Sequence, residues 1–442
     1  MLVEILSRIF YLVFIYPFSF LQPRLNSEKK IVIVGSGFSG LIAAVKLQKA
    51  GYTKIKIIET NHQIGGTWLV NKFPGVACDV TSHFYCPSFY LNSNWSKAFA
   101  PGPEILKYMI DMAKHFDLYK LIDFNTKVTN CEWNDNSKIW TVHAEDVISK
   151  ARKQFSCDYL IPATGPLRKP LWPEFKNSKA FEGKVMHTAL WDEDYDISNK
   201  KVAVIGTGAT AVQVVPGISK TVKSLKVFQR SPAWVPPRYG FVYGRKMKAA
   251  LKYIPGFLWI YRICKYLYIE MGYWLLIKEG NLRDKTVKVM HHVHKSRMRR
   301  KPELTKTMTP TYPLGCKRMT PSDTYFKAIC QENVDVISDR IEEFSANGIK
   351  TKDGTEHEFD CIIYATGYDV MAGMKEMKIK GRNGYDLCRQ FDENGAFTYL
   401  GTCVPNFPNC FFITGPGTGL GHNSILLMME SQVDFIIFLE GN

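Results

Sequence analysis

Short apolar runs rich in β-branched residues alternate with longer helical stretches along much of the chain. In the first such unit, residues 31–34 (IVIV) predict a buried parallel strand, residues 41–50 predict a helix, and residues 55–58 (IKII) predict a second strand. A second unit repeats this order, with the strands expected at 202–205 (VAVI) and 225–228 (LKVF). The order strand, helix, strand is a βαβ unit, so the pattern predicts an α/β fold with parallel sheets.

A glycine-rich turn joins the first strand to its helix in the manner of a dinucleotide site. Gly35, Gly37 and Gly40 have the spacing G-x-G-x-x-G, and Glu59 follows 19 residues beyond Gly40, at the end of the second strand. The first glycine permits a tight turn, the second lets the backbone approach a pyrophosphate, and the third lets the helix pack on the strand. The helix N-terminus then faces the phosphates, and Glu59 accepts from a ribose 2′-hydroxyl. The alternative is a glycine turn with a structural role only.

The second unit has a similar turn, in which residues 206–211 read GTGATA. In place of Glu59 it has Arg230, 19 residues beyond Ala211, and Ser231 follows. A carboxylate suits a bare ribose hydroxyl and repels a phosphate, whereas a guanidinium and a hydroxyl suit a 2′-phosphate. We therefore predict FAD in the first site and NADP in the second; the alternative is that Arg230 is an ordinary surface charge. The expected NADP contacts are Gly206, Thr207, Gly208, Ala209, Thr210, Ala211, Val212, Gln213, Arg230 and Ser231.

Two further segments, 158–165 (DYLIPATG) and 360–367 (DCIIYATG), predict short apolar strands that end in the same Ala-Thr-Gly. In flavoproteins with two nucleotide sites, segments of this kind mark the crossings between the FAD and NADP domains. We therefore expect an FAD domain made of 25–165 and 367–442, and an NADP domain of 166–366 inserted into it.

Two stretches depart from the alternation of strand and helix. Residues 240–310 predict a helical subdomain, and within it 251–277 is apolar but interrupted by charges. Those charges favour a buried or membrane-skimming subdomain over a transmembrane helix. Within residues 1–24, the run 9–21 is almost wholly apolar, and Arg24, Lys29 and Lys30 follow it, which predicts a membrane anchor with the catalytic body in the cytosol. An interfacial helix and a secreted protein with a cleaved signal peptide are the alternatives.

Composition narrows the class of protein. At 442 residues, 46% of them hydrophobic, the chain is long enough for two or three domains. The net charge is +16, with a dense basic run at 291–301 (HHVHKSRMRRK). Because nothing resembles a nucleic-acid-binding module, we interpret this run as a solvated helix face or a phosphate-attracting patch, and we expect no nucleic-acid partner. Eleven cysteines without C-x-x-C or a zinc-like spacing exclude the dithiol reductases, predict no metal site and suit a reducing compartment.

Two longer motifs identify a resemblance. Residues 181–192, FEGKVMHTALWD, fit the pattern F-x-G-x-x-x-H-x-x-x-W-[PD], and Gly65 to Asp79 fits G-G-x-W-x4-[FY]-P-G-x3-D. Both patterns are fingerprints of the Baeyer–Villiger monooxygenases among the class B flavoprotein monooxygenases, and the chain resembles this family over nearly its whole length. The residues that match the first pattern are Phe181, Gly183, His187, Trp191 and Asp192.

The resemblance implies two Rossmann-like domains, with the NADP domain inserted into the FAD domain, and it implies the FAD contacts. Residues 411–422 (FFITGPGTGLGH), a third glycine-rich turn expected after a strand, resemble the family's late FAD segment near the flavin ring. Ordinary core packing is the alternative for Trp68 and Tyr85. The contacts implied are Ser39, Glu59, Gly66, Thr67, Trp68, Leu69, Val70, Ala77, Cys78, Asp79, Tyr85 and Val128.

Lys317 and Arg318 lie in PLGCKRMTPSDTY, which resembles the segment with the family's catalytic arginine. In the chemistry that the resemblance implies, reduced FAD and O₂ form a C4a-peroxide that must stay an anion to attack a carbonyl carbon. A fixed guanidinium lowers the pKa of that peroxide and stabilises the oxyanion that follows. Asp79 is expected to hold and orient Arg318. The alternative is a surface Arg318 paired with a distant carboxylate.

The activity implied is the NADPH-dependent insertion of one oxygen atom from O₂ next to the carbonyl of a small lipophilic ketone, giving an ester or lactone. Oxidation of nitrogen or sulfur centres by a flavin-containing monooxygenase is one alternative. A membrane-tethered flavin-binding protein without oxygenase activity is the other. His187 is expected to be a hinge contact that shapes the NADP-bound form, with general-base catalysis as the alternative.

The resemblance also concerns the end of the chain. Members of the family usually continue for some tens of residues past a segment like 424–439, and that extension closes over NADP and the substrate pocket, whereas this sequence stops at Asn442. A fragment, a truncated sequence and a shorter variant are the three alternatives. In each of them the coupling of NADPH consumption to oxygenation is open.

Overall fold

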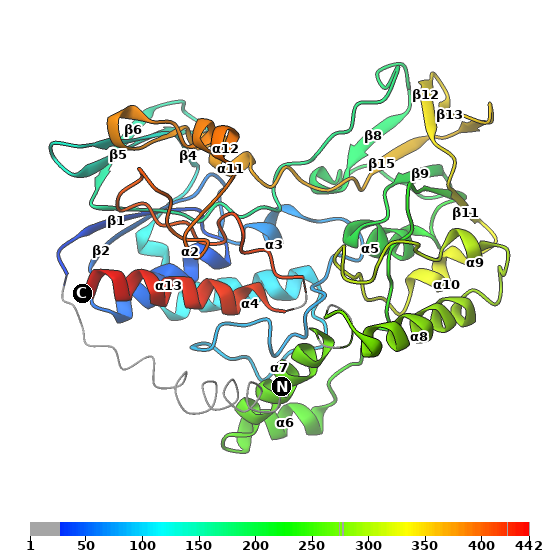
Figure 1. The fold of residues 1–442 in the computed structure, drawn as a ribbon, viewed down its shortest axis with the longest axis horizontal. Coiled ribbons are helices and arrows are strands. Elements are labelled where there is room, and N and C mark those ends of the chain that lie inside the picture. Colours follow the sequence, from blue (N-terminus) through cyan, green and yellow to red (C-terminus); the bar gives the residue numbers. More distant parts are fainter. Residues whose placement is uncertain (1–26, 274, 276–277, 422, 442) are drawn as a thin grey trace.

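Residues 27–273, 275, 278–421 and 423–441 are described by a computed structural model of the chain (Figure 1). The membrane anchor expected at 1–24 lies outside these residues. Among the residues that are described, every helix is too short or too polar to cross a lipid bilayer.

The first βαβ unit forms a four-stranded parallel sheet on the left of Figure 1. The two strands predicted from the apolar runs pair in register, from Lys30 opposite Lys54 to Val34 opposite Ile58. Their side chains are almost wholly buried because helices and further strands cover both faces. In sheet order the strands are β3 (Ile122–Asp123), β2 (Lys54–Ile58), β1 (Lys30–Val34) and β7 (Tyr159–Pro162), and the crossover helix is α2 (Phe38–Lys49).

The second unit forms a five-stranded parallel sheet on the right of Figure 1. Both strands predicted for it are confirmed, and the strand expected to end in the second Ala-Thr-Gly pairs in parallel with the first of them. In sheet order the strands are β11 (Val334–Ile337), β10 (Ser224–Phe228), β9 (Lys201–Ile205), β15 (Cys361–Tyr364) and β8 (Lys184–His187), and the crossover helix is α5 (Ala209–Ile218).

An antiparallel unit precedes the last strand of each parallel sheet. One such unit stands before β7 and the other before β15, so the two halves repeat the same plan. The first is completed by a short strand from late in the chain. The strands are β4 (Thr126–Asn134), β5 (Ile139–Asp146), β6 (Arg152–Cys157) and β16 (Ile379–Lys380) in the first unit, and β12 (Ile341–Ser345), β13 (Gly348–Thr351) and β14 (Glu356–Glu358) in the second.

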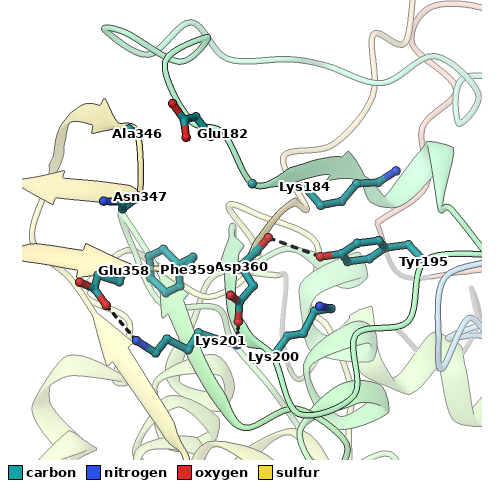
Figure 2. Close-up of a pocket in the computed structure, with 11 residues that line it drawn as sticks. Glu182, Lys184, Tyr195, Lys200, Lys201, Ala346, Asn347, Glu358, Phe359 and Asp360 are labelled. Carbon is teal, nitrogen blue, oxygen red and sulfur yellow. Dashed lines mark hydrogen bonds and ion pairs between the residues drawn. The ribbon is translucent and has the colours of Figure 1, made fainter.

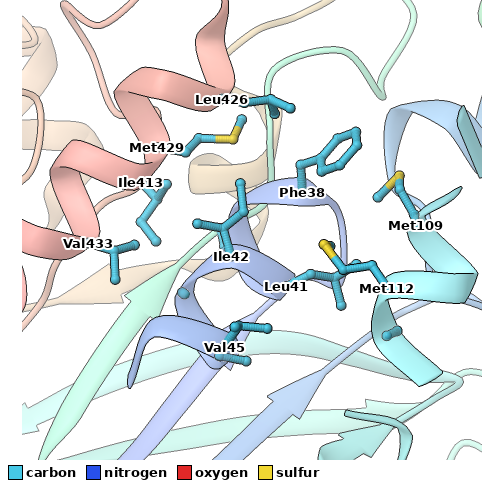
Figure 3. Close-up of a cluster of buried hydrophobic side chains, with 14 of the residues drawn as sticks. Phe38, Leu41, Ile42, Val45, Met109, Met112, Ile413, Leu426, Met429 and Val433 are labelled. Carbon is cyan, nitrogen blue, oxygen red and sulfur yellow. The ribbon is translucent and has the colours of Figure 1, made fainter. Parts of the chain in front are cut away.

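Helix α2 lies in the centre of the largest apolar cluster, between α4 (Gly102–His115) and α13 (Ile425–Gly441) (Figure 3). Leu41 and Ile42 are completely buried there. Met109 and Met112 reach this cluster from α4, and Val433 reaches it from α13. The C-terminal helix is thus part of the core that holds the first nucleotide turn.

Within 240–310, where a helical subdomain was expected, the described residues form the helices α6, α7, α8 and α9, of which α6 and α7 lie at the lower edge of Figure 1. The described helices not yet given are α3 (Thr67–Val70), α6 (Arg245–Tyr253), α7 (Phe257–Gly272), α8 (Asn281–Arg297), α9 (Leu304–Thr307), α10 (Tyr325–Ile329), α11 (Ala372–Met377) and α12 (Leu387–Asn394), with the 3-10 turns η3 (Tyr119–Leu121), η4 (Thr188–Leu190) and η6 (Arg382–Gly384).

The prediction of a strand before the third glycine-rich turn, at 411–422, was wrong. Residues near its start form only isolated bridges, one of which joins Cys410 to Leu160 of β7. The backbone N–H of Phe411 donates to the Leu160 carbonyl at 2.9 Å and that of Ile413 donates to the Pro162 carbonyl at 3.2 Å, but the pairing does not extend. Glycines at 415, 417, 419 and 421 follow directly. Because every second residue is then a glycine, one face of a strand there would have no side chains to pack.

A buried ion pair fastens α13 to α2, which yields a prediction about stability. Lys46 Nζ lies 2.6 Å from Asp434 Oδ1, with the two side chains 5% and 25% exposed. The variant Lys46→Met removes this cation from a carboxylate that is mostly buried, so we expect the free energy of unfolding in urea to fall by about 3 kcal/mol. The double variant Lys46→Met/Asp434→Leu should recover most of the loss. A single variant as stable as the wild type would contradict the role of the pair.

Three buried histidines predict how stability depends on pH. Burial lowers the pKa of His83, His187 and His294 to about 4 in the folded chain. The unfolded chain takes up these protons near pH 6.5, so each imidazole removes about 1.4 kcal/mol of stability per pH unit as the pH falls from about 6.5 to 4. Urea unfolding at several pH values measures this slope. We expect His294→Gln to flatten it, and an unchanged slope would show that His294 titrates alike in both states.

Candidate functional site

The first glycine turn is shaped by close backbone contacts. Gly35 has φ of +109°, and a Cβ atom there would lie 2.7 Å from the carbonyl oxygen of Ala163. A Cβ atom on Gly40 would lie 1.9 Å from the Gly35 carbonyl oxygen. At Gly37, by contrast, the nearest atom to an added Cβ is Gly66 Cα, at 3.6 Å. The outer two glycines are thus required by packing, while the middle one stands at the start of α2 with only an ordinary contact to Gly66, where a pyrophosphate fits.

Glu59 lies at the carboxyl end of β2 and is 5% exposed. Its carboxylate accepts from the Ser36 backbone N–H at 2.8 Å and from the Ser36 hydroxyl at 2.7 Å. It also accepts from the backbone N–H and the side-chain amide of Asn61, at 2.8 and 2.7 Å. Four donors occupy the carboxylate, which has about four acceptor positions, so Glu59 also holds the glycine turn in place. A ribose hydroxyl can take the place of a side-chain donor there.

The segment expected to line the flavin forms the short helix α3 beside this turn. Gly65 and Gly66 both have positive φ, +137° and +51°. Trp68 Nε1 donates to the Tyr85 hydroxyl at 3.3 Å, and the two rings meet edge to face. Val128, another expected FAD contact, is buried in the apolar cluster of β4 and β5.

The second glycine turn repeats the geometry of the first. Gly206 has φ of +127°, and a Cβ atom there would lie 2.4 Å from the carbonyl oxygen of Ala365. Gly208 has no atom within 4 Å of an added Cβ. In both units, therefore, the first glycine lies against an Ala-Thr-Gly segment, at Ala163 or Ala365, and the second has no close contact at an added Cβ.

Positive side chains gather at the carboxyl end of β10, next to this second turn. Arg230 is exposed, and the Thr207 hydroxyl donates to the Ser231 carbonyl at 2.9 Å. Lys317 Nζ donates to the Ser231 hydroxyl at 3.1 Å. Ser231 thus brings Lys317 to the segment that begins with Arg230, so two cations and a hydroxyl are available to a 2′-phosphate.

The two nucleotide units meet where residues 73–79 pack on α5. A Cβ atom on Gly75 would lie 2.6 Å from the Gln213 carbonyl oxygen, so the glycine allows the backbones to approach. The Gln213 side chain accepts from the Ala77 backbone N–H at 2.8 Å. Gln213, which was expected to contact NADP, is therefore used here to hold the 73–79 segment against the second unit.

Arg318 and Asp79 form a two-pronged ion pair at this junction. Arg318 Nε donates to Asp79 Oδ2 at 2.9 Å and Nη2 donates to Oδ1 at 2.6 Å. The third nitrogen, Nη1, donates to the Leu420 carbonyl at 2.9 Å, in the late glycine-rich turn. Burial lowers the pKa of the guanidinium, but the Asp79 carboxylate outweighs this effect and the pKa is raised above its usual value. Arg318 thus stays charged, its orientation is fixed, and its side chain is still 43% exposed.

Sequence reasoning missed Arg238 and Asn71. Arg238 Nη2 donates to the carbonyl of Cys78, next to Asp79, and its guanidinium lies 4.3 Å from the Phe99 ring centre. The buried amide of Asn71 donates to the Thr67 and Leu167 carbonyls and accepts from the Tyr368 hydroxyl at 2.6 Å. Asn71 therefore connects α3 to the residues that directly follow the two Ala-Thr-Gly crossings. Arg238 stands in no recognisable motif, and Asn71 occupies an unspecified position of the Gly65–Asp79 pattern, so the sequence alone carried no signal for either residue.

The fingerprint residues 181–192 mostly serve packing. Phe181 belongs to the apolar cluster under β9 and β15, and Gly183 passes so close to Asp360 that an added Cβ would lie 2.8 Å from its carbonyl oxygen. Asp192 pairs with Lys184, whose hydrogen bond lowers the pKa of that carboxyl. Trp191 packs against the cluster of the second sheet.

His187 is buried at the end of β8, where its ring joins two segments. Nδ1 accepts from the Ala189 backbone N–H at 3.0 Å, so the proton belongs on Nε2, which lies 3.3 Å from the Thr366 hydroxyl. Because burial lowers its pKa to about 4, the imidazole is neutral at pH 7. These contacts link the end of β8 to the second Ala-Thr-Gly segment and occupy both ring nitrogens. The expected hinge role in the NADP-bound form stays a prediction.

A hollow of about 830 Å³ lies near the start of the fingerprint but has the wrong position for the chemistry (Figure 2). Its lining includes Lys184, Lys201 and Asp360, which stand at the amino ends of β8, β9 and β15. Nucleotides bind at the carboxyl ends of parallel strands, where the two glycine turns lie. Most of its charges are already paired, as in Lys201 Nζ with Glu358 at 2.9 Å.

The described residues fit two dinucleotides and offer no metal site. No group of three or more His, Cys, Asp or Glu side chains in the described part of the chain could hold a metal ion. Each glycine turn has a middle glycine without close contacts at a helix N-terminus, and their acidic and basic partners differ as FAD and NADP require.

Comparisons with known proteins agree with this geometry. Residues 28–381 match the family model described as flavin-binding monooxygenase-like. A Baeyer–Villiger monooxygenase of Pseudomonas aeruginosa is 35% identical over 418 residues, which cover 94% of this chain and 77% of that protein. An open structure of cyclohexanone monooxygenase superposes with a TM-score of 0.81 at 26% identity, covering 94% of this chain and 88% of that one. A structure of OTEMO in complex with FAD and NADP gives 0.82 at 27% identity, with 94% and 84% covered.

These matches extend over most of the chain and over more than two thirds of each relative. The shared fold therefore includes both glycine turns and the junction between them. The chain belongs to the flavin-binding monooxygenase-like family and, within it, to the Baeyer–Villiger monooxygenases.

Proposed function

We propose that the chain is an NADPH-dependent flavoprotein monooxygenase that converts a ketone, O₂, NADPH and a proton into an ester or lactone, NADP⁺ and water. The observation that carries this proposal is the two-pronged Arg318–Asp79 pair between the two glycine turns. Oxidation of a nitrogen or sulfur centre requires no such guanidinium, because the electrophilic oxygen donor is then neutral. The related Pseudomonas aeruginosa protein bears the same name as this reaction type.

FAD is assigned to the first glycine turn and NADPH to the second. The FAD domain consists of residues 25–165 and 367–442, and the NADP domain of 166–366 is inserted between them. Support comes from the two parallel sheets, which fall on either side of the Ala-Thr-Gly crossings. Bound FAD supplies the activation of O₂, with electrons from NADPH.

Arg318 is the catalytic residue of this proposal. When the ketone carbonyl is attacked, negative charge develops on oxygen, and a guanidinium that is already oriented stabilises that charge without reorganisation. Asp79 and the Leu420 carbonyl hold the guanidinium plane from two sides, since they bind all three of its nitrogens. Asp79 is therefore a positioning residue, and Arg238 supports it through the Cys78 carbonyl.

The substrate is proposed to be a small lipophilic ketone, because the subdomain within 240–310 is rich in apolar and aromatic side chains. The proposed anchor at residues 1–24 rests on the apolar sequence alone. The expected cytosolic position of the catalytic body rests on the basic residues that follow it.

Removal of the guanidinium tests the catalytic role. With Arg318→Ala we expect ester formation to fall about 10²–10³-fold, because one preorganised stabiliser of an oxyanion is lost. Product measured by mass spectrometry against NADPH absorbance gives both the rate and the coupling. Arg318→Lys keeps the charge but loses the fork, so it should recover only part of the activity. Sulfide oxidation that survives Arg318→Ala, in an enzyme without ketone turnover, would favour the nitrogen and sulfur alternative.

Replacement of Arg230 tests the nucleotide assignment. Arg230→Ala should raise the KM for NADPH about 10- to 100-fold, the loss of a charge-assisted hydrogen bond, and leave the KM for NADH unchanged. Steady-state kinetics with both nucleotides measures the difference, and Lys223→Ala, another exposed cation on the same unit, is the matched control. Equal changes for both nucleotides would show that Arg230 does not read the 2′-phosphate.

A further inference from the structure

Helix α7 exposes an apolar stripe on the side that faces away from the protein. Ile260, Cys264, Tyr268 and Met271 recur at intervals of four, four and three residues, and all four are exposed. Ile260, Tyr268 and Met271 are between 53% and 58% exposed. This spacing places them on one face of a helix, along about three turns.

The opposite face of α7 is fixed to the core, so the stripe cannot turn inward. Arg262 is 4% exposed, and its Nη1 donates to the Cys86 carbonyl at 2.7 Å and to the His83 carbonyl at 3.3 Å. Its guanidinium also lies 5.0 Å from the Phe84 ring centre. Tyr266, one turn further along, is buried against the same ring at 5.7 Å.

The apolar surface continues onto the segments next to α7. Tyr253, the last residue of α6, and Ile254, which follows it, are 72% and 55% exposed. Phe241 and Val242, which precede α6, are 47% and 69% exposed. Lys265 of α7 lies 5.8 Å from the Phe241 ring centre, so these residues adjoin the helix. We call the surface made by these residues and the α7 stripe the α6–α7 face, and it lies at the lower edge of the molecule (Figure 1).

Cations border the α6–α7 face. From residue 245 to residue 272 the chain has six basic residues and one acidic residue, Glu270. Arg262 is buried and Glu270 contributes the one negative charge, so the other five basic residues leave this segment with a net positive charge. Arg245, Lys246 and Lys252 are exposed on α6. Their positive field is the complement of an anionic lipid surface.

We propose that the α6–α7 face docks on a bilayer that contains anionic phospholipids. Exposed Tyr, Ile and Met side chains enter the interface, while the α6 lysines and arginine meet lipid phosphates. A second copy of the chain is less suitable as the occupant, because a two-fold contact would bring the cations of both α6 helices together. The helices lie on the membrane rather than across it, which agrees with their length and polarity within the described residues.

Vesicle flotation with the full chain tests the proposal. Wild-type protein should float with phosphatidylcholine vesicles that contain about 30% phosphatidylserine, and less so as salt rises, because the attraction is screened. The variant Ile260→Glu/Met271→Glu should bind about tenfold more weakly. The control Ile148→Glu/Phe397→Glu changes two residues that are more exposed but lie elsewhere, and it should bind like the wild type. Lys246→Glu/Lys252→Glu should lose only the dependence on phosphatidylserine.

Three results would overturn the docking of the α6–α7 face on lipid, provided that flavin absorbance and thermal unfolding show each variant to be folded. Stripe and control variants that both float like the wild type would point to another segment, such as the apolar residues near the N-terminus. Wild-type protein that does not float would overturn the proposal directly. Light scattering that shows a dimer in the wild type but not in the stripe variant, without lipid, would assign the face to a second copy.

Discussion

The pair of Asp79 and Arg318 is the interaction on which the chemistry of this protein depends. The residues are 239 positions apart in the chain, and each belongs to a different nucleotide unit. They meet because the 73–79 segment packs on α5, where Gly75 allows the backbones to approach and Gln213 binds the Ala77 amide. A carboxylate that binds two guanidinium nitrogens fixes the plane of the whole group and hence the position of the third nitrogen. The packing between the two units therefore determines where the positive charge of Arg318 lies.

The same local design occurs twice and explains how one domain is inserted into the other. In each unit an Ala-Thr-Gly segment follows the last strand of the parallel sheet in chain order, β7 or β15, and its alanine carbonyl lies against the first glycine of a nucleotide turn. The chain leaves the first unit after one such segment and returns to it after the second. Asn71 binds residues from both crossings, and His187 contacts Thr366 in the second. A few buried polar contacts thus help to fix how the two units are placed relative to each other. Breaking them would leave buried polar groups without hydrogen-bond partners, which is unfavourable.

The residues that identify the family and those that carry its chemistry are largely separate. Most of the fingerprint at 181–192 packs the edge of the second sheet, and a neutral, hydrogen-bonded His187 is its one polar link toward the nucleotide side. Such a segment is constrained by packing, so it identifies a fold more directly than a reaction. The reaction depends instead on an exposed guanidinium at a cleft between domains.

The sequence by itself determined the local elements. Periodicity predicted β1, β2, β9 and β10, and the glycine spacing predicted two turns, because strand burial and backbone sterics act over a few residues. The exception was the segment before the glycines at 415–421, which has a strand-like composition but finds too few pairing partners. Only the tertiary structure decided that Glu59 braces its own turn, that Gln213 and Asn71 join the units, and that Leu420 meets Arg318. These contacts join residues far apart in the chain, and their geometry is set by how whole sheets and helices pack, which no local pattern of side chains encodes.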